Sequence, residues 1–313
     1  MTQVLLVGVG NMAKEYAKVL KELNIAFDVI GRGKDSAESF QREFEIPVKQ
    51  GGLDKAFSSL KIPTHAIVAT TLESLEENTI FLLNNGVKNI LVEKPGALTK
   101  EGILRIANIA ETNDANVYIA YNRRFYASIL EAKRRVEQDG GLSSIIFEFT
   151  EWSHVIKDLN KTTFQLNNWF IGNSTHVIDT AFFFGGIPKQ ISAYVAGSLD
   201  WHPTGSVYAG AGITENDILF SYHANWSAPG SWKLELLTNQ NRYIFRPFEK
   251  LSVQKLGTVL IEEIELNDTK DKEFKPGIFE QTNSFLNMNA LSSNLLRVNE
   301  SYERYAIYEK MRG

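Results

Sequence analysis

Val4-Leu5-Leu6-Val7 is a short apolar run, and it leads directly into the stretch Gly8-Val9-Gly10-Asn11-Met12-Ala13. An apolar run that ends in glycines, before residues with helical apolar spacing, predicts a buried strand, a tight turn and a helix in succession. In such a turn Gly8 permits the sharp backbone path, Gly10 lets the main chain approach a ligand, and Ala13 keeps the helix close to the sheet. The chain therefore begins with a strand–turn–helix unit typical of a parallel α/β sheet.

The start of this first helix is also a predicted binding site. The first N–H groups of a helix have no partner within the helix, and they suit the phosphates of a dinucleotide. The pattern GxGxxA in Gly8–Ala13, placed between a strand and a helix, is typical of such a site. The alternative is a turn whose small residues serve packing only.

The end of the second predicted strand indicates which dinucleotide is bound. Sites that prefer NAD usually have an acidic residue there for the ribose 2′-hydroxyl. Here Gly31 is followed by Arg32, with Lys34 and Ser36 close behind. A guanidinium binds a 2′-phosphate through two hydrogen bonds, whereas a carboxylate repels it. We therefore predict NADP as the cofactor and Arg32 as one of its contacts, with NAD as the alternative if Arg32 is only a solvated loop cation.

Strand and helix patterns alternate as far as Tyr121. After the first strand, further strands are predicted at Phe27–Ile30, His65–Thr70, Ile90–Val92 and Val117–Ala120, and helices at Ala13–Leu23, Ser36–Phe44, a stretch ending at Leu83, and a stretch capped by Thr99. Short, fully apolar strands separated by helices predict a parallel sheet covered on both faces. Residues 1–121 are thus expected to form an α/β domain.

The pattern changes after Tyr121. Strand-like alternation now dominates, apart from helices near Tyr126–Gln138 and Ser174–Phe184 and a helical end at Phe279–Met311. The predicted strands are Ser144–Thr150, Gln190–Ala196, Ile218–Asn225, Trp232–Thr238, Tyr243–Arg246 and Val259–Leu266. Residues 122–313 are therefore expected to form an α+β domain on a large, open, mostly antiparallel sheet.

Composition excludes several classes of function. The 313 residues carry 33 Lys and Arg against 37 Asp and Glu, so a basic surface for nucleic acid is not expected. The lack of cysteine excludes disulfides, thiolate metal sites and cysteine nucleophiles. We see no secretory signal pattern and no apolar run near the ~18 residues that span a bilayer. We expect a cytoplasmic protein that binds neither nucleic acid nor membrane.

Glu93-Lys94-Pro95 closes a predicted buried strand at its carboxyl end, where α/β sheets bind their ligands. A lysine there can point at a reacting oxygen and stabilise the negative charge that develops on it. The alternative is a loop lysine paired with a surface acid.

Five motifs together resemble the glucose–fructose oxidoreductase / inositol 2-dehydrogenase (Gfo/Idh/MocA) family. They are Gly8–Ala13, Ala69-Thr70-Thr71, Glu93–Thr99, Tyr121-Asn122-Arg123-Arg124-Phe125 and His176-Val177-Ile178-Asp179, in the family's order along the whole chain. The resemblance implies a Rossmann domain, a second domain with an open antiparallel sheet, and hydride transfer between a nicotinamide and a carbohydrate-like alcohol or ketone. It also implies a homodimer or homotetramer.

The resemblance further implies roles for single residues. Lys94 would polarise the reacting oxygen, and His176 would be the acid/base, for which an ordinary pKa of about 6.5 is suited. Cofactor contacts are expected from Gly8, Gly10, Asn11, Met12, Ala13, Arg32, Thr70, Thr71, Glu93 and Lys94, and substrate contacts from Asn122, Arg123, Trp152, Trp169, Asn173 and His176. Asp179, one helical turn after His176, is expected to have a structural or orienting role.

The chain departs from the family pattern at one position. Family dehydrogenases commonly carry a carboxylate four residues before the histidine, and here that residue is Gly172. A Lys–Asp–His triad is therefore absent, and Asn173 offers a hydrogen bond without a charge. Two other functions stay open for this reason: a non-catalytic NADP-binding regulator, and a lyase or glycosidase that oxidises and restores its cofactor in one cycle.

The segment 151–170 is the predicted substrate side. Its aromatic and amide side chains, Trp152 and Trp169 among them, suit the stacking face and hydroxyls of a sugar. Lys157, Lys161 and Arg123 would suit a phosphate or a nucleotide diphosphate. A surface loop with packed tryptophans is the alternative. The five histidines show no metal-ligand spacing, so we predict no metal.

Overall fold

The structure, a computed structural model, describes residues 3–313 and divides them into two units. The first unit contains the chain up to Asn122 together with Lys270–Tyr302, and the second contains Arg123–Thr269 together with Glu303–Gly313. The sequence placed one boundary near residue 121 and assigned everything after it to a single domain. In the structure, a later segment of 33 residues, Lys270–Tyr302, packs with the first sheet instead.

The first unit is built on a seven-stranded sheet in the order β15-β6-β5-β4-β1-β2-β3. Its strands are β1 (Val4–Val7), β2 (Phe27–Gly31), β3 (Val48–Gln50), β4 (His65–Val68), β5 (Asn89–Glu93), β6 (Asn116–Ala120) and β15 (Leu296–Arg297). All pairs are parallel except β15 with β6. The order of the six parallel strands is that of the doubly wound dinucleotide-binding fold, and its crevice lies where the order reverses, between β1 and β4.

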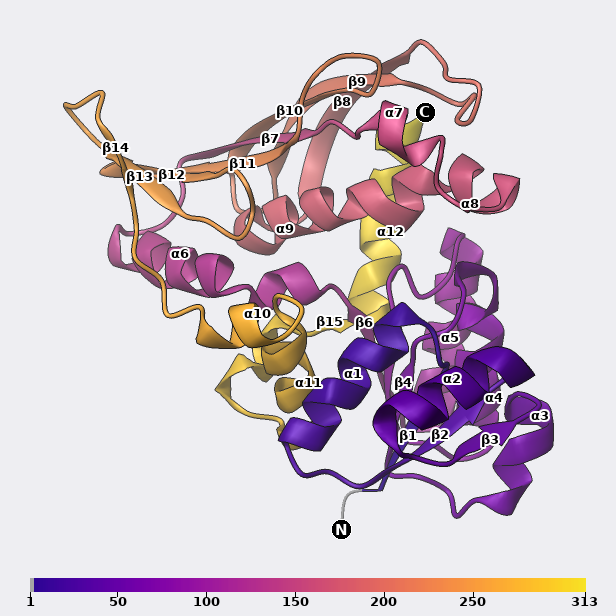
Figure 1. Cartoon of the computed structure of the whole chain (residues 1–313). Coiled ribbons are helices and arrows are strands. Elements are labelled where there is room, and N and C mark those ends of the chain that lie inside the picture. Colours follow the sequence, from indigo (N-terminus) through magenta and orange to yellow (C-terminus); the bar gives the residue numbers. More distant parts are fainter. Residues whose placement is uncertain (1–2) are drawn as a thin grey trace. The chain divides into compact units, whose positions relative to one another are not determined.

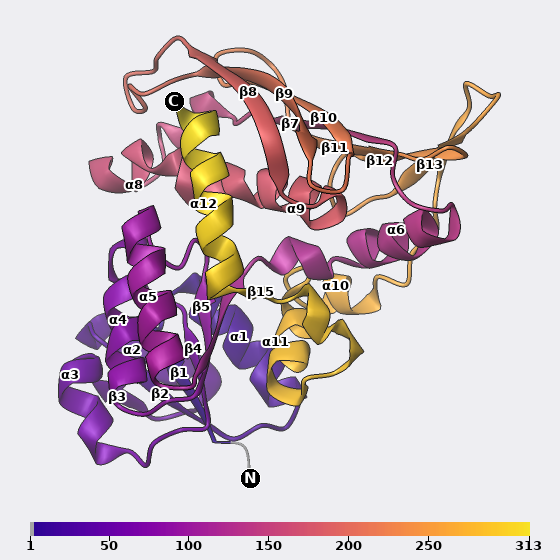
Figure 2. The same ribbon diagram turned by 180° about the vertical axis from the view of Figure 1, so that it is seen from behind.

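Helices cover both faces of this sheet (Figures 1 and 2). The helices of the unit are α1 (Asn11–Glu22), α2 (Lys34–Phe44), α3 (Leu53–Ala56), α4 (Leu75–Asn84), α5 (Lys100–Thr112), α11 (Ile278–Asn287) and, apart from its first residue, α10 (Thr269–Glu273). The four residues of β1 are fully buried, as a strand covered on both faces requires. Thr99 caps α5, since its hydroxyl accepts a hydrogen bond of 3.1 Å from the Gly102 N–H. The predicted α/β Rossmann domain is confirmed.

The second unit is built on an eight-stranded sheet in the order β14-β13-β12-β11-β7-β10-β9-β8. Its strands are β7 (Ser144–Phe149), β8 (Pro188–Ala196), β9 (Val207–Thr214), β10 (Leu219–Asn225), β11 (Trp232–Leu237), β12 (Asn241–Phe245), β13 (Ser252–Lys255) and β14 (Ile261–Glu263). Only the β7–β10 pair is parallel among these described strands. The predicted large, mostly antiparallel sheet is confirmed.

Strand β9 was not predicted, and its glycines explain why. Gly210 lies opposite Tyr222 and Gly212 lies opposite Phe220 on β10. A Cβ at Gly210 would come within 2.5 Å of the Tyr222 ring, and a Cβ at Gly212 within 2.6 Å of the Phe220 ring. Glycine is unfavourable in strands, so the pattern did not predict one. Here the two glycines make room for the aromatic rings of the neighbouring strand β10.

Helices lie along one face of this second sheet (Figures 1 and 2). The helices and helical turns of the unit are α6 (Ala127–Gln138), α7 (Ser153–Ile156), α8 (Thr163–Asn167), a π-helical turn (Phe170–Ser174), α9 (Thr175–Gly185) and the last part of α12 (Val298–Arg312). The Phe182 ring of α9 packs edge-on against Phe147 and Phe220 of the sheet. The opposite face exposes Tyr194 and Leu219, which are 71% and 60% exposed.

In the described part of the chain, residues 3–313, we find no helix with the length and apolar character needed to cross a membrane.

Candidate active site

The glycine turn has the geometry that a bound phosphate requires. Gly8 has φ +118°, and a Cβ on it would lie 2.2 Å from the Ala69 carbonyl oxygen, so only glycine fits. A Cβ on Gly10 would meet no protein atom within 4 Å, because this residue faces open space. No side chain caps the N-terminus of α1. The exposed start of α1 is thus free to receive an anion, and it fits the pyrophosphate of a dinucleotide.

The other predicted cofactor residues of the first unit follow the carboxyl ends of β2 and β4. Arg32 is exposed directly after β2. Thr70 and Thr71 follow β4, and the Thr70 hydroxyl accepts a hydrogen bond of 3.1 Å from the Asn78 side-chain amide. Since β1, β2 and β4 are neighbouring parallel strands, all these residues lie at the same edge of the sheet as Gly8–Ala13.

Glu93 and Lys94 lie at that same edge, where β5 ends. The Tyr16 hydroxyl donates a hydrogen bond of 2.7 Å to Glu93 Oε1. Burial raises the pKa of Glu93, while the Tyr16 hydrogen bond and the positive charges of Lys94 and Lys275 lower it. The Glu93 carboxyl thus accepts a hydrogen bond from a phenol and is influenced by two ammonium charges, one of them on the lysine that the sequence predicts to be catalytic.

The segment that follows α10 contributes residues that the sequence analysis missed. Lys275 Nζ lies 3.2 Å from the Met12 sulfur in the glycine turn, and the carbonyl of Pro276 accepts a hydrogen bond of 2.9 Å from the Asn122 side chain. Gln281 is fully buried on α11 beside the Tyr16 hydroxyl, at 3.4 Å. More than 250 positions separate Lys275 from Met12, so no local pattern in the sequence could indicate the contact.

In the second unit, His176 lies in the first turn of α9, just after the π-helical turn Phe170–Ser174. One turn later, Asp179 is fully buried and binds Arg124 through two hydrogen bonds, Nε to Oδ2 at 2.7 Å and Nη2 to Oδ1 at 2.6 Å. Arg304 Nη1 is 3.6 Å from the same carboxylate. These contacts support the expected structural role of Asp179, since they attach α9 to two other parts of the unit.

Glu151 is the main residue of this unit that the sequence analysis missed. Its side chain is 6% exposed and follows strand β7. The Asn173 amide donates hydrogen bonds of 3.1 and 3.0 Å to its two carboxylate oxygens, and the Ser174 hydroxyl donates one of 2.7 Å. Burial raises the pKa of Glu151, while the donors Ser174, Trp169, Asn173 and Trp232 lower it. A carboxyl group thus lies beside the turn that contains Gly172, although position 172 itself has none.

The indole of Trp232, the first residue of β11, connects Glu151 to two predicted residues. The Arg123 guanidinium stacks over this ring at 4.5 Å, and the centroids of the His176 and Trp232 rings are 6.2 Å apart. Burial lowers the pKa of Arg123, and the charges of Tyr126, Glu249 and Glu151 counteract this effect. The second unit therefore brings Arg123, Asn173 and His176 together around Glu151 and Trp232.

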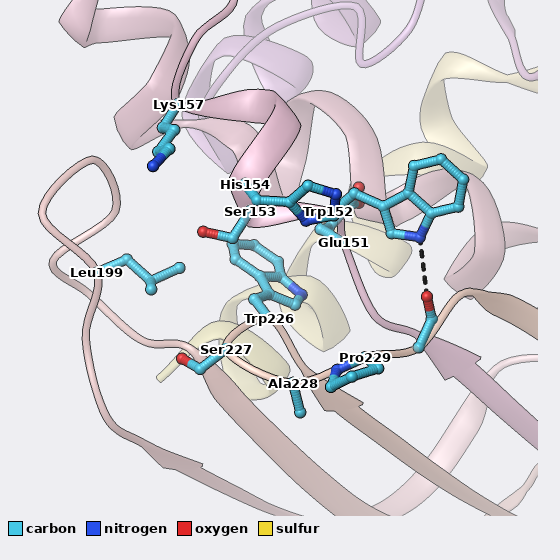
Figure 3. A pocket seen from close by; sticks show the side chains of 11 residues that line it. Glu151, Trp152, Ser153, His154, Lys157, Leu199, Trp226, Ser227, Ala228 and Pro229 are labelled. Atoms are coloured by element: carbon cyan, nitrogen blue, oxygen red, sulfur yellow. Dashed lines mark hydrogen bonds between the residues drawn. The ribbon is translucent and has the colours of Figure 1, made fainter.

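A pocket of about 650 Å³ lies next to Glu151 (Figure 3). Its lining residues come from the segment after β7, the loop after β8 and the turn between β10 and β11: Glu151, Trp152, Ser153, His154, Lys157, Leu199, Trp226, Ser227, Ala228, Pro229 and Gly230. Trp152 is 57% exposed, and its indole N–H donates a hydrogen bond of 2.8 Å to the Gly230 carbonyl, the dashed line in Figure 3. Trp152 and Lys157 thus line a pocket, as expected of substrate contacts.

Trp169 and Lys161 are not among the residues that line this pocket. The Trp169 ring packs edge-on against Trp201 with centroids 6.2 Å apart, and Lys161 is exposed on the loop before α8. The indole N–H of Trp169 is close enough to Glu151 to lower the pKa of that carboxyl, although it completes no hydrogen bond of normal geometry. The predicted role of Trp169 as a substrate contact stays a prediction.

Among residues 3–313, no group of three or more histidine and acidic side chains has the arrangement of a metal site. The predicted absence of a metal stays a prediction.

Comparisons with known proteins give a family match for the first part of the chain. The sequence model of an oxidoreductase family with an NAD-binding Rossmann fold, Gfo/Idh/MocA, matches residues 2–121. A search of curated protein sequences gives no match.

Three solved structures share the fold over nearly the whole chain. An oxidoreductase from Thermotoga maritima has a TM-score of 0.79 and 18% identity, covering 99% of this chain and 95% of that one. A levoglucosan dehydrogenase, in complex with NADH and L-sorbose, has a TM-score of 0.80 and 16% identity, with coverage of 99% and 95%. A UDP-N-acetylglucosamine 3-dehydrogenase from Acidithiobacillus ferrooxidans has a TM-score of 0.77 and 14% identity, with coverage of 99% and 96%. The resemblance predicted from the five motifs is confirmed: residues 2–121 match the model of the Gfo/Idh/MocA oxidoreductase family, and the whole chain has the fold of the dehydrogenases compared with it.

Proposed function

We propose that the protein is an NADP-dependent oxidoreductase that transfers a hydride between a nicotinamide and an alcohol or ketone of a sugar or sugar derivative. One observation carries the proposal: Gly8–Ala13 and Glu93-Lys94 lie at the carboxyl ends of β1 and β5, on one edge of a parallel sheet, and this is the edge at which such sheets bind dinucleotides. The sugar class is supported by two compared structures, the levoglucosan and UDP-N-acetylglucosamine dehydrogenases.

The proposed chemistry divides between the cofactor and the protein. When bound, the nicotinamide supplies or accepts the hydride. In the oxidising direction, the carbinol carbon loses that hydride and the hydroxyl loses its proton to His176, which leaves a ketone. The Lys94 ammonium holds the same oxygen and stabilises its negative charge. In the reducing direction, His176 returns the proton to the oxygen.

Lys94 provides the main test of this function. We expect Lys94→Met to lower kcat on the sugar substrate by about 100- to 1,000-fold, because it removes the charge next to the developing alkoxide. NADPH binding, measured by fluorescence titration, should change little. Lys88→Met is the matched control: Lys88 immediately precedes the same strand, at the opposite edge of the sheet, where its side chain bonds the Asn113 carbonyl. Unchanged turnover in Lys94→Met would remove Lys94 from the mechanism.

A panel of sugars separates the proposed function from its alternatives. Cofactor binding without oxidation or reduction of any sugar, phosphorylated sugar or nucleotide-linked sugar would indicate a regulator. Product formation without net consumption of cofactor would indicate a lyase or glycosidase that restores its cofactor.

The NADP preference depends on Arg32. We expect Arg32→Gln to weaken NADPH binding by about 10- to 100-fold, the effect of losing one charge-assisted contact, and to leave NADH binding nearly unchanged. Arg42→Gln, at the far end of α2, makes the same charge change away from the ribose and is the control. Arg32 is a cleaner target than Gly31, where an added Cβ would lie 3.0 Å from a Val9 methyl. Equal loss of NADH and NADPH binding would contradict the preference.

The predicted homodimer or homotetramer and the predicted cytoplasmic location are not tested by the structure and stay predictions. Sedimentation of the purified protein would measure the first.

A further inference from the structure

We infer that Glu151 supplies the carboxylate that position 172 lacks, and that it acts as a positioning residue for His176 and Arg123. The inference rests on the proposed function, because it assigns a role in the same reaction. The family pattern places its acid four residues before the histidine. In this chain the acid comes from the segment after strand β7, and its hydrogen bonds reach the π-helical turn that precedes the histidine helix.

The first part of the argument is the contact between Glu151 and the turn before His176. Both carboxylate oxygens bind the Asn173 amide, and Oε1 also binds the Ser174 hydroxyl. Consecutive side chains of an α-helix diverge by about 100°, so they rarely reach one acceptor. Asn173 and Ser174 do so from a π-helical turn, a wider form that is frequent at functional sites. His176 comes two residues later, so the carboxylate holds the turn from which its helix starts.

The second part is the Trp232 ring. Glu151 lies near its indole N–H, Arg123 stacks on its face, and His176 lies beside it. The Glu151 charge also favours the charged form of the Arg123 guanidinium, which is otherwise costly to bury. The Glu151 carboxylate is thus placed to influence both Arg123 and His176, the two predicted substrate contacts with an ionisable side chain.

The third part is the cost of keeping this acid buried. The hydrogen-bond donors to Glu151 given above are neutral, and its side chain is 6% exposed. Glu235 is a contrasting case in the same unit, because it is 2% exposed but forms ion pairs with Lys233 and Arg242. A buried acid that is satisfied by neutral donors contributes little to stability, which favours a functional reason for its presence.

Three variants test the inference. Glu151→Gln keeps the size of the side chain and removes its charge. Its oxygen can still accept from Ser174, and the Asn173 amide can turn to offer its own oxygen. Glu151→Asp keeps the charge on a shorter side chain. Glu235→Gln is the matched control, since it removes a buried charge that belongs to an ion-pair group on the sheet.

We expect Glu151→Gln to lower kcat by about 100-fold, since small misplacements of a catalytic group have effects of this size, with little change in the KM for the cofactor. Its Tm should equal or exceed that of the wild type. Glu151→Asp should recover part of the lost kcat. Glu235→Gln should show the opposite result, with a lower Tm and an unchanged kcat. A Glu151→Gln enzyme with wild-type kcat, or one whose activity falls only in proportion to its Tm, would overturn the inference.

A measurement that needs no turnover separates this inference from the proposed function. The NMR signal of the His176 ring, assigned with His176→Asn, should move in Glu151→Gln and stay in place in Glu235→Gln. If Lys94→Met and His176→Asn retain full activity, or if no substrate is turned over, the proposed function fails while the NMR result still decides the role of Glu151. If those variants are inactive and the His176 signal is the same in Glu151→Gln and wild type, only this inference fails.

Discussion

Glu93 in the first unit and Glu151 in the second are similar groups in different surroundings. Glu93 is the last residue of β5 and Glu151 follows β7, and burial raises the pKa of each. Glu93 accepts a hydrogen bond from a phenol and lies near two ammonium groups, those of Lys94 and Lys275. Glu151 accepts its hydrogen bonds from neutral amide and hydroxyl groups. Glu93 is thus balanced by a phenol hydrogen bond together with two ammonium charges, and Glu151 by neutral hydrogen-bond donors.

The two acids also differ in whether a local sequence motif indicates them. Glu93 stands next to Lys94 in a recognisable motif, so a local pattern reports both. Glu151 is 22 and 23 positions away from the two residues that bind it, and no motif joins them. A motif therefore reports residues that are adjacent in the sequence, but it reports neither the contacts of Glu93 with Tyr16 and Lys275 nor those of Glu151.

The largest expected effect concerns a third buried acid, Asp179, which is paired by charge in the second unit. Asp179→Asn should lower the free energy of unfolding by about 3–5 kcal/mol, because it leaves the buried Arg124 guanidinium without its carboxylate. Urea denaturation would measure the change. Glu131→Gln, which breaks surface pairs with Arg134 and Arg135, should cost no more than about 1 kcal/mol. Equal effects of the two variants would contradict the distinction between buried and exposed pairs.

An intermediate effect is expected at Tyr16, which is fully buried and bonds Glu93. Tyr16→Phe should cost about 1–3 kcal/mol of unfolding free energy, because the buried Glu93 oxygen loses its donor. Tyr222→Phe is the control. Burial raises the pKa of Tyr222 to about 12, and its hydroxyl has no hydrogen-bond partner among residues 3–313, so its removal should cost little. A stable Tyr16→Phe protein would show that Glu93 depends on its ammonium neighbours alone.

The smallest expected effect is the pH dependence of stability that Glu151 causes. Unlike Asp179→Asn and Tyr16→Phe, Glu151→Gln should raise stability. The pKa of Glu151 is raised in the folded protein, so the native state holds this proton to a higher pH than the unfolded chain does. The wild type therefore loses stability as pH rises from the unfolded pKa through the folded one, and Glu151→Gln does not. The Tm of the variant relative to the wild type should increase across that interval and then level off. Scanning calorimetry at a series of pH values would show it.

Glu93→Gln provides the comparison for that experiment. Two ammonium groups offset the burial of Glu93, so the corresponding gain in Tm should be smaller. A larger gain at Glu93 than at Glu151 would reverse the contrast between the two sites.

The first sheet was largely predictable from the sequence because its signals are local. Short, mostly apolar runs predicted β1, β2, β4, β5 and β6, and the glycines after Val7 predicted the turn. The short strands β3 and β15 were missed, since three and two residues are too few to show a period. In the second sheet, β9 was missed because its glycines follow the shape of the aromatic rings on β10.

The residues of the candidate site also divide into those that local sequence predicts and those that only the structure reveals. The sequence by itself determined the glycine turn, the lysine that ends β5 and the histidine helix, because each depends on backbone conformation or residue type within a short stretch. The tertiary structure alone decided that Lys275 lies beside Met12 and that Glu151 binds Asn173 and Ser174. The physical reason is that a side chain completes its hydrogen bonds with whatever groups packing brings near it, and distance along the chain does not limit which groups those are.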